Sequence, residues 1–152
     1  MSEAGGRSAW DSPGFLLWHA TLRWQRAIAA ALRPLGLTHV QFVLLAGIWW
    51  LGQSDQRPSQ RGLVDHAGTD RMMTSQVVRT LESRGLLRRE LDGVDARVRR
   101  LAVTPEGERL SGRAIAAVEA TDQGYFAPVP NREDLMDLLN GLAGRKAAAV
   151  AE

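Results

Sequence analysis

The sequence predicts a mainly α-helical domain with one small β-hairpin, in which a helix-turn-helix carries the hairpin as a wing and longer helices stand at both ends of the chain. Two observations predict the centre. A short segment of helical periodicity at 58–67 is followed, after a glycine, by a longer one at 70–84, and such a pair joined by a short turn is a helix-turn-helix. Two short runs, 86–91 and 98–103, then flank an Asp-Gly turn signal, which indicates a hairpin.

The first regular segment is a helix expected at 13–33. Residues 1–12 are expected to form a flexible tail, and residues 13–152 a single domain. The helix is free of glycine and proline from residue 15 on and is apolar around much of its circumference. Because a small core does not need this much apolar surface, the segment is suited to contact a partner subunit. A central position within its own domain is the equally weighted alternative.

A second helix follows a break at 34–37. Thr38 and Gln41 form a capping-box pattern, in which the hydroxyl and the amide each satisfy a backbone N–H group of the new helix. The winged helix-turn-helix is therefore expected to begin near residue 38 and to end near residue 104.

The helix expected at 70–84 has one apolar and one polar face. Thr69 and Asp70 are suited to cap its start, and Gly85 is suited to end it because glycine takes the left-handed conformation at low cost. Apolar residues recur at helical spacing, at Met73, Val77, Val78 and Leu81. The opposite face carries hydroxyl, amide and guanidinium groups, on Arg71, Thr74, Ser75, Gln76 and Arg79.

The basic residues are almost all arginine. The net charge is +2 with 19 basic side chains, of which only Lys146 is a lysine. A GC-rich genome would explain this excess as a whole, but not a cluster in one hairpin and the residues that lead to it. The cluster consists of Arg84, Arg88, Arg89, Arg97, Arg99 and Arg100. Since the planar fork of arginine suits phosphate and guanine, a polar helix followed by this hairpin predicts a winged helix that binds DNA.

Two further helices are expected in the region 105–150. Thr104, Pro105 and Glu106 form a helix start, with a capping hydroxyl, a proline in the first turn and an acid at the positive end of the helix dipole. After a break at 127–130, Asn131 is the next cap, and leucines follow at helical spacing, at Leu135, Leu138, Leu139 and Leu142. Apolar stripes at both ends of the chain predict that the terminal helices, about 13–33 and 105–150, are dimerisation helices of an intertwined homodimer.

Composition excludes several classes of site. The chain has no cysteine, which excludes disulfides, thiolate metal sites and thiol redox sensing. His19, His39 and His66 lie far apart without ligand spacing, so we expect no metal site and no cofactor. Paired carboxylates, a nucleophile–base set and a phosphate-binding glycine loop are all missing from the sequence, so we expect no enzyme. No window reaches the ~18 continuous apolar residues of a membrane span, and no apolar signal region begins the sequence, so we expect a cytoplasmic protein without a membrane partner.

Residues 14 to 145 resemble the multiple-antibiotic-resistance regulator (MarR) family of bacterial transcription factors. The most specific part runs from Leu63 to Leu110 and contains LVDHAG, MTSQVVRTLESRGLLRR, DAR and LAVTPEGERL. Family members typically carry an Asp-x-Arg at the wing tip, then a Leu-Thr pair, then a glycine. Here these are Asp95-Ala96-Arg97, Val103-Thr104 and Gly107. Ala96 stands where the family usually has arginine or lysine, which removes one candidate phosphate contact from the wing.

The resemblance implies a way of binding DNA. The N-terminal half of the 70–84 helix would enter the major groove, where Gln76 would bond an adenine edge and Arg71 a guanine edge. Ser75 and Thr74 are short donors suited to phosphates or to a thymine methyl group, and Arg79 would hold the DNA backbone. A homodimer would present two such helices about one helical turn (~34 Å) apart, so the operator would be a pseudo-palindrome.

The wing and an effector site are implied in the same way. Arg97 would enter a minor groove, whose negative potential is high in narrow A·T-rich stretches, and Asp95 would pair with an arginine and set the shape of the wing. Most family members release DNA when a small aromatic molecule binds between the dimerisation helices and the winged helix. The candidates for such a cleft are Trp18, His19, Arg23, Trp49 and Trp50, although aromatic residues on helices are also ordinary core residues.

The sequence and the resemblance together predict a homodimeric repressor that binds double-stranded DNA, and the resemblance implies that a small aromatic effector releases it. The alternative is a winged-helix protein-interaction module without DNA binding. That module would have apolar or acidic residues where Arg71, Gln76 and Arg97 stand, so these three positions favour DNA.

Overall fold

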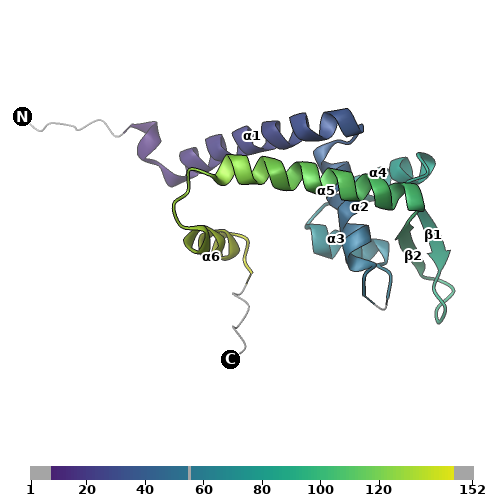
Figure 1. The fold of residues 1–152 in the computed structure, drawn as a ribbon. Coiled ribbons are helices and arrows are strands. Elements are labelled where there is room, and N and C mark those ends of the chain that lie inside the picture. The colour runs from purple at the N-terminus through teal and green to yellow at the C-terminus, as the bar shows by residue number, and fades with distance from the viewer. Residues whose placement is uncertain (1–7, 55, 146–152) are drawn as a thin grey trace, which may run out of the picture.

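A computed structural model of the chain describes residues 8–54 and 56–145 (Figure 1). It confirms a mainly helical fold with one two-stranded antiparallel hairpin. The α-helices are α1 (Pro13–Leu32), α2 (His39–Leu51), α3 (Gln60–Ala67), α4 (Arg71–Ser83), α5 (Pro105–Phe126) and α6 (Arg132–Leu142). The strands are β1 (Leu87–Leu91) and β2 (Arg99–Val103), and two short 3-10 helices are η1 (Ala9–Asp11) and η2 (Arg33–Leu35).

Helices α1 and α5 run antiparallel as one long arm above the winged helix-turn-helix (Figure 1). Two hydrogen bonds between side chains of one helix and groups of the other tie them together. The indole N–H of Trp24 donates to Asp122 over 2.8 Å, and the Tyr125 hydroxyl donates to the carbonyl oxygen of Ala20 over 2.6 Å. Because these pairs lie toward the far end of the arm, α1 and α5 stay together well beyond the point where they leave the core.

The core lies where the C-terminal half of α1 and the N-terminal half of α5 meet α2, α4 and the hairpin. Its fully buried members are aliphatic, and they include Ile28, Leu32, Leu44, Leu45, Ile48, Leu63, Val78, Leu81, Leu87 and Leu101. Gly107 allows the closest approach of two elements, because a Cβ atom there would lie 1.8 Å from the carbonyl oxygen of Leu86. The start of α5 is thereby held directly against the junction between α4 and β1.

The connection between the strands begins at the expected Asp-Gly turn signal, Asp92-Gly93. The strands pair from Leu87 opposite Val103 to Leu91 opposite Arg99, and residues 92–98 form a longer loop closed by the Asp92 N–H group, which donates to Val98 over 3.1 Å. Gly93 is not among the glycines of positive φ that the described residues contain. The turn signal marked the right place, and the Asp92 carboxylate organises the loop by accepting hydrogen bonds from the Val94 and Asp95 N–H groups.

The N-terminal tail is partly ordered, in contrast to the flexible tail expected at 1–12. Residues 1–7 lie outside the described part of the chain, but Ser8 and Asp11 form a capping box around η1. The Trp10 ring lies 4.8 Å from the His19 ring, and the Phe15 ring lies 4.5 Å from it. These aromatic contacts attach η1 to the first turns of α1.

Helix α6 and the outer half of α1 present apolar side chains to solvent. No residue of α6 is buried, and the exposed large apolar side chains include Leu16, Leu17, Trp18, Met136, Leu138, Leu139 and Leu142. Figure 1 shows α6 set apart from the winged helix-turn-helix, below the far end of the arm. These faces are suited to pack against a second protomer.

Among the described residues, no single helix is both long and apolar enough to cross a membrane. Helices α1 and α2 reach the required length and hydropathy only when they are taken together, and they are bent by 73° at the break between them.

Candidate nucleic-acid interface

The helix-turn-helix is built by two capped helices and a glycine. Ser59 caps α3 by accepting from the Gly62 N–H group over 3.1 Å, and Asp70 caps α4 by accepting from the Met73 N–H group over 2.8 Å. Gly68, between the helices, has a φ of 64°, a conformation that L side chains rarely adopt. Local sequence thus sets where α3 ends and where α4 begins.

The outer face of α4 carries most of the predicted base-reading residues. Arg71 and Gln76 are exposed and Ser75 is partly exposed. Arg71 and Ser75, four residues apart, lie on one side of the helix, and Gln76 lies further around the same exposed surface. Arg79 is exposed as well, but its Nε group donates to the Ser75 carbonyl oxygen over 3.3 Å. Met72 is 82% exposed and adds an apolar side chain to this face.

Thr74 does not belong to this surface, so its predicted DNA contact is wrong. The side chain is fully buried, and its hydroxyl donates to the Asp70 carbonyl oxygen over 2.7 Å. The same hydroxyl also lies 2.7 Å from that of Thr69. A buried hydroxyl is tolerated here because both interactions are supplied within the first turn of α4, and the side chain therefore supports the cap.

Two residues of α3 extend the polar face and were missed from the sequence. Gln60 and Arg61 lie beside Arg71 around a shallow cavity of about 280 Å³. Both stand in the first turn of a helix capped by Ser59, where the free N–H groups and the helix dipole favour a phosphate. A polar pair in the first turn of the first helix was the signal that could have identified them.

Arg97 stands at the tip of the wing with its side chain 91% exposed. It forms two bonds to Asp95, from Nε over 3.2 Å and from the other guanidinium nitrogen over 3.3 Å. Asp95 was expected to pair with an arginine, and the arginine is the very one expected to enter the minor groove. The side-chain and backbone hydrogen bonds from Arg97 hold the pKa of the Asp95 carboxyl below its ordinary value, so the pair is charged at neutral pH.

A second acid, Asp92, shapes the wing more directly and was also missed. Its carboxylate accepts from the backbone N–H groups of Val94 and Asp95 over 2.8 and 3.0 Å, and from Nε of Arg100 over 2.6 Å. Its side chain is only 8% exposed. The two backbone bonds, and after them the bond from Arg100, lower the pKa of Asp92 to about 2.

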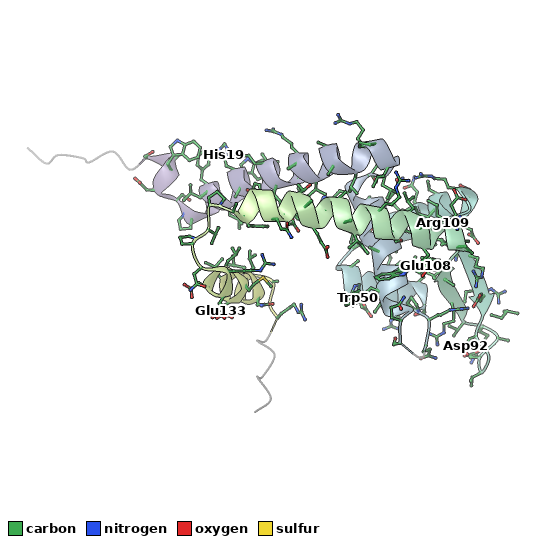
Figure 2. The ribbon with its side chains drawn as sticks, in the orientation of Figure 1. His19, Trp50, Asp92, Glu108, Arg109 and Glu133 are labelled. Atoms are coloured by element: carbon green, nitrogen blue, oxygen red, sulfur yellow. The ribbon has the colours of Figure 1, made fainter. Side chains whose placement is uncertain are left out.

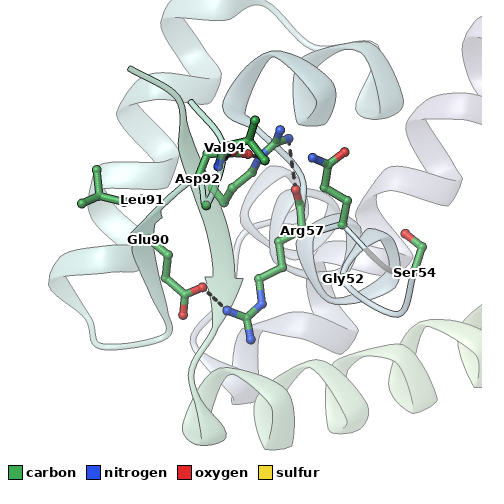
Figure 3. A pocket seen from close by; sticks show the side chains of 10 residues that line it. Gly52, Ser54, Arg57, Glu90, Leu91, Asp92 and Val94 are labelled. Atoms are coloured by element: carbon green, nitrogen blue, oxygen red, sulfur yellow. Dashed lines mark hydrogen bonds and ion pairs between the residues drawn. The ribbon is translucent and has the colours of Figure 1, made fainter. Parts of the chain in front are cut away.

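The base of the wing is joined to the loop before α3 around a cavity of about 500 Å³ (Figure 3). Arg100 donates to the Arg57 carbonyl oxygen over 3.2 Å, and the Arg57 guanidinium pairs with Glu90. Glu90 also accepts from Nε of Arg88 over 2.8 Å. We refer to Arg57, Arg88, Glu90, Asp92 and Arg100 as the wing brace.

The arginine cluster of the sequence thus has a partly structural role. Arg88 and Arg100 belong to the wing brace, and Arg89 pairs with Glu82 on α4 over 3.1 Å. Arg97 and Arg99 remain exposed in and beside the loop at 92–98. Fewer guanidinium groups of the wing are therefore free of acidic partners than the sequence suggested.

The predicted effector residues are not brought together within one protomer. His19 lies at the far end of the arm, whereas Trp50 lies under its other end, at the end of α2 (Figure 2). Trp18 and Arg23 are exposed along α1, and Trp49 lines a separate cavity of about 180 Å³ against β2. Spacing along the sequence gave no information on this separation, because α1 is long and α2 crosses only its inner end.

A different cavity, of about 460 Å³, lies between α1, α2 and the turn of the helix-turn-helix. We refer to it as the inter-helix cavity. Its walls are mostly aliphatic, and its lining includes Ala29, His39, Val40, Val43, Ala67 and Thr69. Burial lowers the pKa of His39, and the Asp122 carboxylate opposes this in part. The imidazole ring also packs edge-on against Trp24, with 5.1 Å between the ring centres.

Comparison with known proteins agrees with this geometry. The MarR family model matches residues 37–98. An uncharacterized HTH-type transcriptional regulator of Bacillus subtilis, YdcH, is 40% identical over 131 residues, which cover 86% of this chain and 89% of the relative. The chain belongs to the MarR family. It is accordingly a DNA-binding transcriptional regulator and not an enzyme.

Other MarR relatives cover nearly the whole chain. The HTH-type transcriptional repressor Rv2887 of Mycobacterium tuberculosis is 32% identical over 135 residues, which cover 87% of this chain and 94% of the relative. The crystal structure of CouR from Rhodococcus jostii RHA1 bound to p-coumaroyl-CoA has a TM-score of 0.81 at 30% identity, covering 94% of this chain and 99% of CouR. CouR has also been solved bound to a 23-mer DNA duplex, and that structure has a TM-score of 0.75 at 26% identity, covering 94% of this chain.

Proposed function

We propose that the chain is a homodimeric repressor that binds a pseudo-palindromic operator and is released from it by a small aromatic ligand. The observation that carries the proposal is the outer face of α4 and α3, where Arg71, Gln76 and Arg61 stand exposed on two capped helices. This face offers amide and guanidinium donors for base edges together with a cation at a helix start for phosphate. The protein acts in the bacterial cytoplasm, where its operator is.

Each residue has a role in this proposal. Gln76 reads an adenine edge and Arg71 a guanine edge in the major groove, and Ser75 contacts a phosphate or a thymine methyl group. Arg79 and Arg61 hold phosphates.

At the wing, the Arg97 side chain leaves its ion pair with Asp95 and enters the minor groove of the DNA. The exchange costs little because Arg97 is almost fully exposed, and an exposed pair of this kind contributes only about 0–1 kcal/mol.

Two protomers are needed to present two reading helices. The leucine face of α6 and the exposed apolar side chains of α1 supply the contact surface. A two-fold axis through these faces places the two α4 helices about one turn of DNA (~34 Å) apart. The resulting operator has two half-sites in inverted orientation.

The effector occupies the inter-helix cavity. Two relatives are known with ligands: CouR with p-coumaroyl-CoA, and Rv2887, whose complex with salicylic acid has a TM-score of 0.65 at 31% identity. In this chain the inter-helix cavity of about 460 Å³ has the size and apolar walls of a small-molecule site. Because α1 forms one wall and the Ala67–Thr69 turn another, a bound ring shifts the reading helix relative to the dimer.

The binding proposal is tested by fluorescence anisotropy with the chain's own upstream promoter DNA at two salt concentrations. Gln76→Ala is expected to lose about 1–3 kcal/mol of discrimination at one base pair of each half-site. Arg61→Gln is expected to weaken binding to all sequences alike and to reduce the log–log salt slope by about 0.9 per half-site. Arg145→Gln, an exposed arginine beyond α6, is the matched control. Absence of salt-sensitive binding would instead favour a protein-interaction module.

The effector proposal has its own test. Salicylate is expected to release the operator from the wild type, and Val43→Phe, which fills the inter-helix cavity, is expected to keep operator affinity while losing the release. Equal release of both proteins would place the effector elsewhere.

A further inference from the structure

A further cavity is separate from the inter-helix cavity and from the base-reading face. It has a volume of about 460 Å³ and lies at the joint where α4 ends and α5 begins. Its apolar lining is Leu35, Leu86 and Leu110. Its charged lining is Arg84, Arg109, Arg113 and Glu106, and Figure 2 labels Arg109 on the first turns of α5. We refer to it as the arginine groove.

The charges of the arginine groove are not balanced within the protomer. Three guanidinium groups face one carboxylate, and none of the ion pairs found among the described residues includes Arg84, Arg109 or Arg113. Arg84 makes only a long bond of 3.4 Å to the Gln41 amide oxygen. Arg109 and Arg113 are four residues apart on α5 and therefore repel each other on the same side of the helix. The wing arginines, by contrast, nearly all have acidic partners.

The walls of the groove are held rigidly. The Leu86 carbonyl oxygen accepts from the Thr104 N–H group over 3.1 Å, and the Gly85 carbonyl oxygen accepts from the Thr104 hydroxyl over 2.6 Å. Gly107 lies directly against Leu86. The two backbone segments that carry the guanidinium groups are therefore held at a fixed distance from each other.

The groove is also distant from the bases that α4 reads. Arg84 is the C-cap of α4, whereas Arg71 begins the helix. A helix of this length extends about 20 Å at 1.5 Å per residue. Arg84 therefore lies at the opposite end of α4 from Arg71.

We propose that the arginine groove binds a small amphipathic organic anion, with a phosphate or carboxylate group on the arginines and an apolar part on the leucines. The planar forks of arginine suit bidentate contacts to either anion. The first turn of α5, whose N-terminus is the positive end of the helix dipole, adds to the favourable potential. The apolar floor distinguishes this site from a groove that holds only the DNA backbone.

The test follows amide and arginine Nε–H resonances of the full-length protein by NMR during titration with phenyl phosphate and, separately, with benzoate and inorganic phosphate. Phenyl phosphate is expected to shift the Leu86, Arg109 and Arg113 signals saturably. It is expected to bind roughly tenfold more tightly than inorganic phosphate, because burial of the ring adds a favourable transfer free energy. Comparing benzoate with phenyl phosphate distinguishes a carboxylate from a phosphate ligand.

Variants of the groove arginines test whether phenyl phosphate binds in the arginine groove or at another site on the protein. The double variant Arg109→Gln, Arg113→Gln is expected to lose at least about 90% of the phenyl phosphate affinity, whereas Arg145→Gln is expected to keep it. Both variants are expected to keep the wild-type affinity for the operator, which separates this proposal from the proposed repressor function. Equal affinity of the double variant and the wild type for phenyl phosphate would overturn the proposal. So would weaker operator binding by the double variant without any saturable shift in the wild type, since that result would assign the arginines to flanking DNA.

Discussion

Replacing Gly107 by alanine is expected to destabilise the protein, although alanine is the better helix former. Gly107 lies in the first turn of α5 and is buried. A Cβ atom there would lie 1.8 Å from the Leu86 carbonyl oxygen and 2.8 Å from its carbonyl carbon. Since real Cβ atoms essentially never approach closer than 3.0 Å, the two backbones must separate by more than 1 Å.

The size of the effect follows from what that separation breaks. The Thr104 N–H bond to Leu86 is lost or stretched from 3.1 Å, and a buried group left without its partner costs about 1–3 kcal/mol. Forcing an extra methyl group into a packed site costs a further 1–3 kcal/mol or so, while the helix preference of alanine over glycine returns about 1 kcal/mol. The net loss expected for Gly107→Ala is about 3 kcal/mol in the free energy of unfolding.

The assay is urea unfolding at one fixed protomer concentration, because dimerisation contributes to apparent stability. The control is Gly112→Ala in the same helix, where the residue is exposed and a Cβ atom would meet nothing within 4 Å. This variant is expected to gain up to about 1 kcal/mol. If Gly107→Ala were as stable as the wild type, or if both variants shifted in the same direction, the close approach of α5 to Leu86 would be refuted.

Three further predictions concern the wing, the reading helix and the dimer. The pKa of Asp92 is lowered to about 2 from an ordinary 3.8, so its hydrogen bonds stabilise the fold above pH 4 and are lost as the pH falls toward 2. In urea unfolding, Asp92→Asn should therefore lose less stability than the wild type between pH 4 and pH 2. An equal loss of stability in both proteins would contradict the wing brace. Thr74→Val should lower stability by about 1 kcal/mol and leave operator preference unchanged in a binding-site selection, whereas a changed preference would return Thr74 to the DNA contacts. Leu139→Glu, on the exposed leucine face of α6, should convert the dimer to monomer in sedimentation and weaken operator binding, while a dimer of unaltered affinity would place the interface elsewhere.

Local signals in the sequence predicted the elements well. Asp70 caps α4, Thr38 and Gln41 form their capping box at the start of α2, and Gly85 ends the recognition helix with a φ of 72°. Each of these features depends on residues within a few positions of one another. Short-range physics fixes them, so they can be predicted from one sequence.

The features that the sequence did not reveal depend on contacts over longer range. The apolar stripe of α4 was predicted at Met73, Val77, Val78 and Leu81. The structure buries Val78 and Leu81, but Met73 is 39% exposed and Thr74 is buried in its place. The rotation of the helix is set by the elements that pack on it, and the Thr74 hydroxyl is buried because local oxygens satisfy it. A polar residue on a helix can therefore be expected to be exposed only when no nearby group satisfies its hydrogen-bonding atoms.

The wing brace and the cavities illustrate the same limit. Arg57 and Glu90 are 33 positions apart in the sequence, and no local pattern marks them as partners. The arginines of the hairpin cannot be told apart in the sequence, yet in the structure Arg88 and Arg100 belong to the wing brace, whereas Arg97 stands exposed at the wing tip. Aromatic residues such as Trp18 and Trp49 shared a composition signal but lie on separate parts of the fold.

Because no residue of α6 is buried, a single protomer leaves the apolar face of this helix exposed to solvent. In the proposed homodimer, the exposed leucines of α6 decide which polypeptides pair at an operator. Any related regulator that offers a matching row would compete for this face and produce mixed pairs with two different half-site preferences. In the proposed homodimer, substitutions on α6 alone would therefore change which regulators pair and which operators they bind, without any change in the residues that contact DNA.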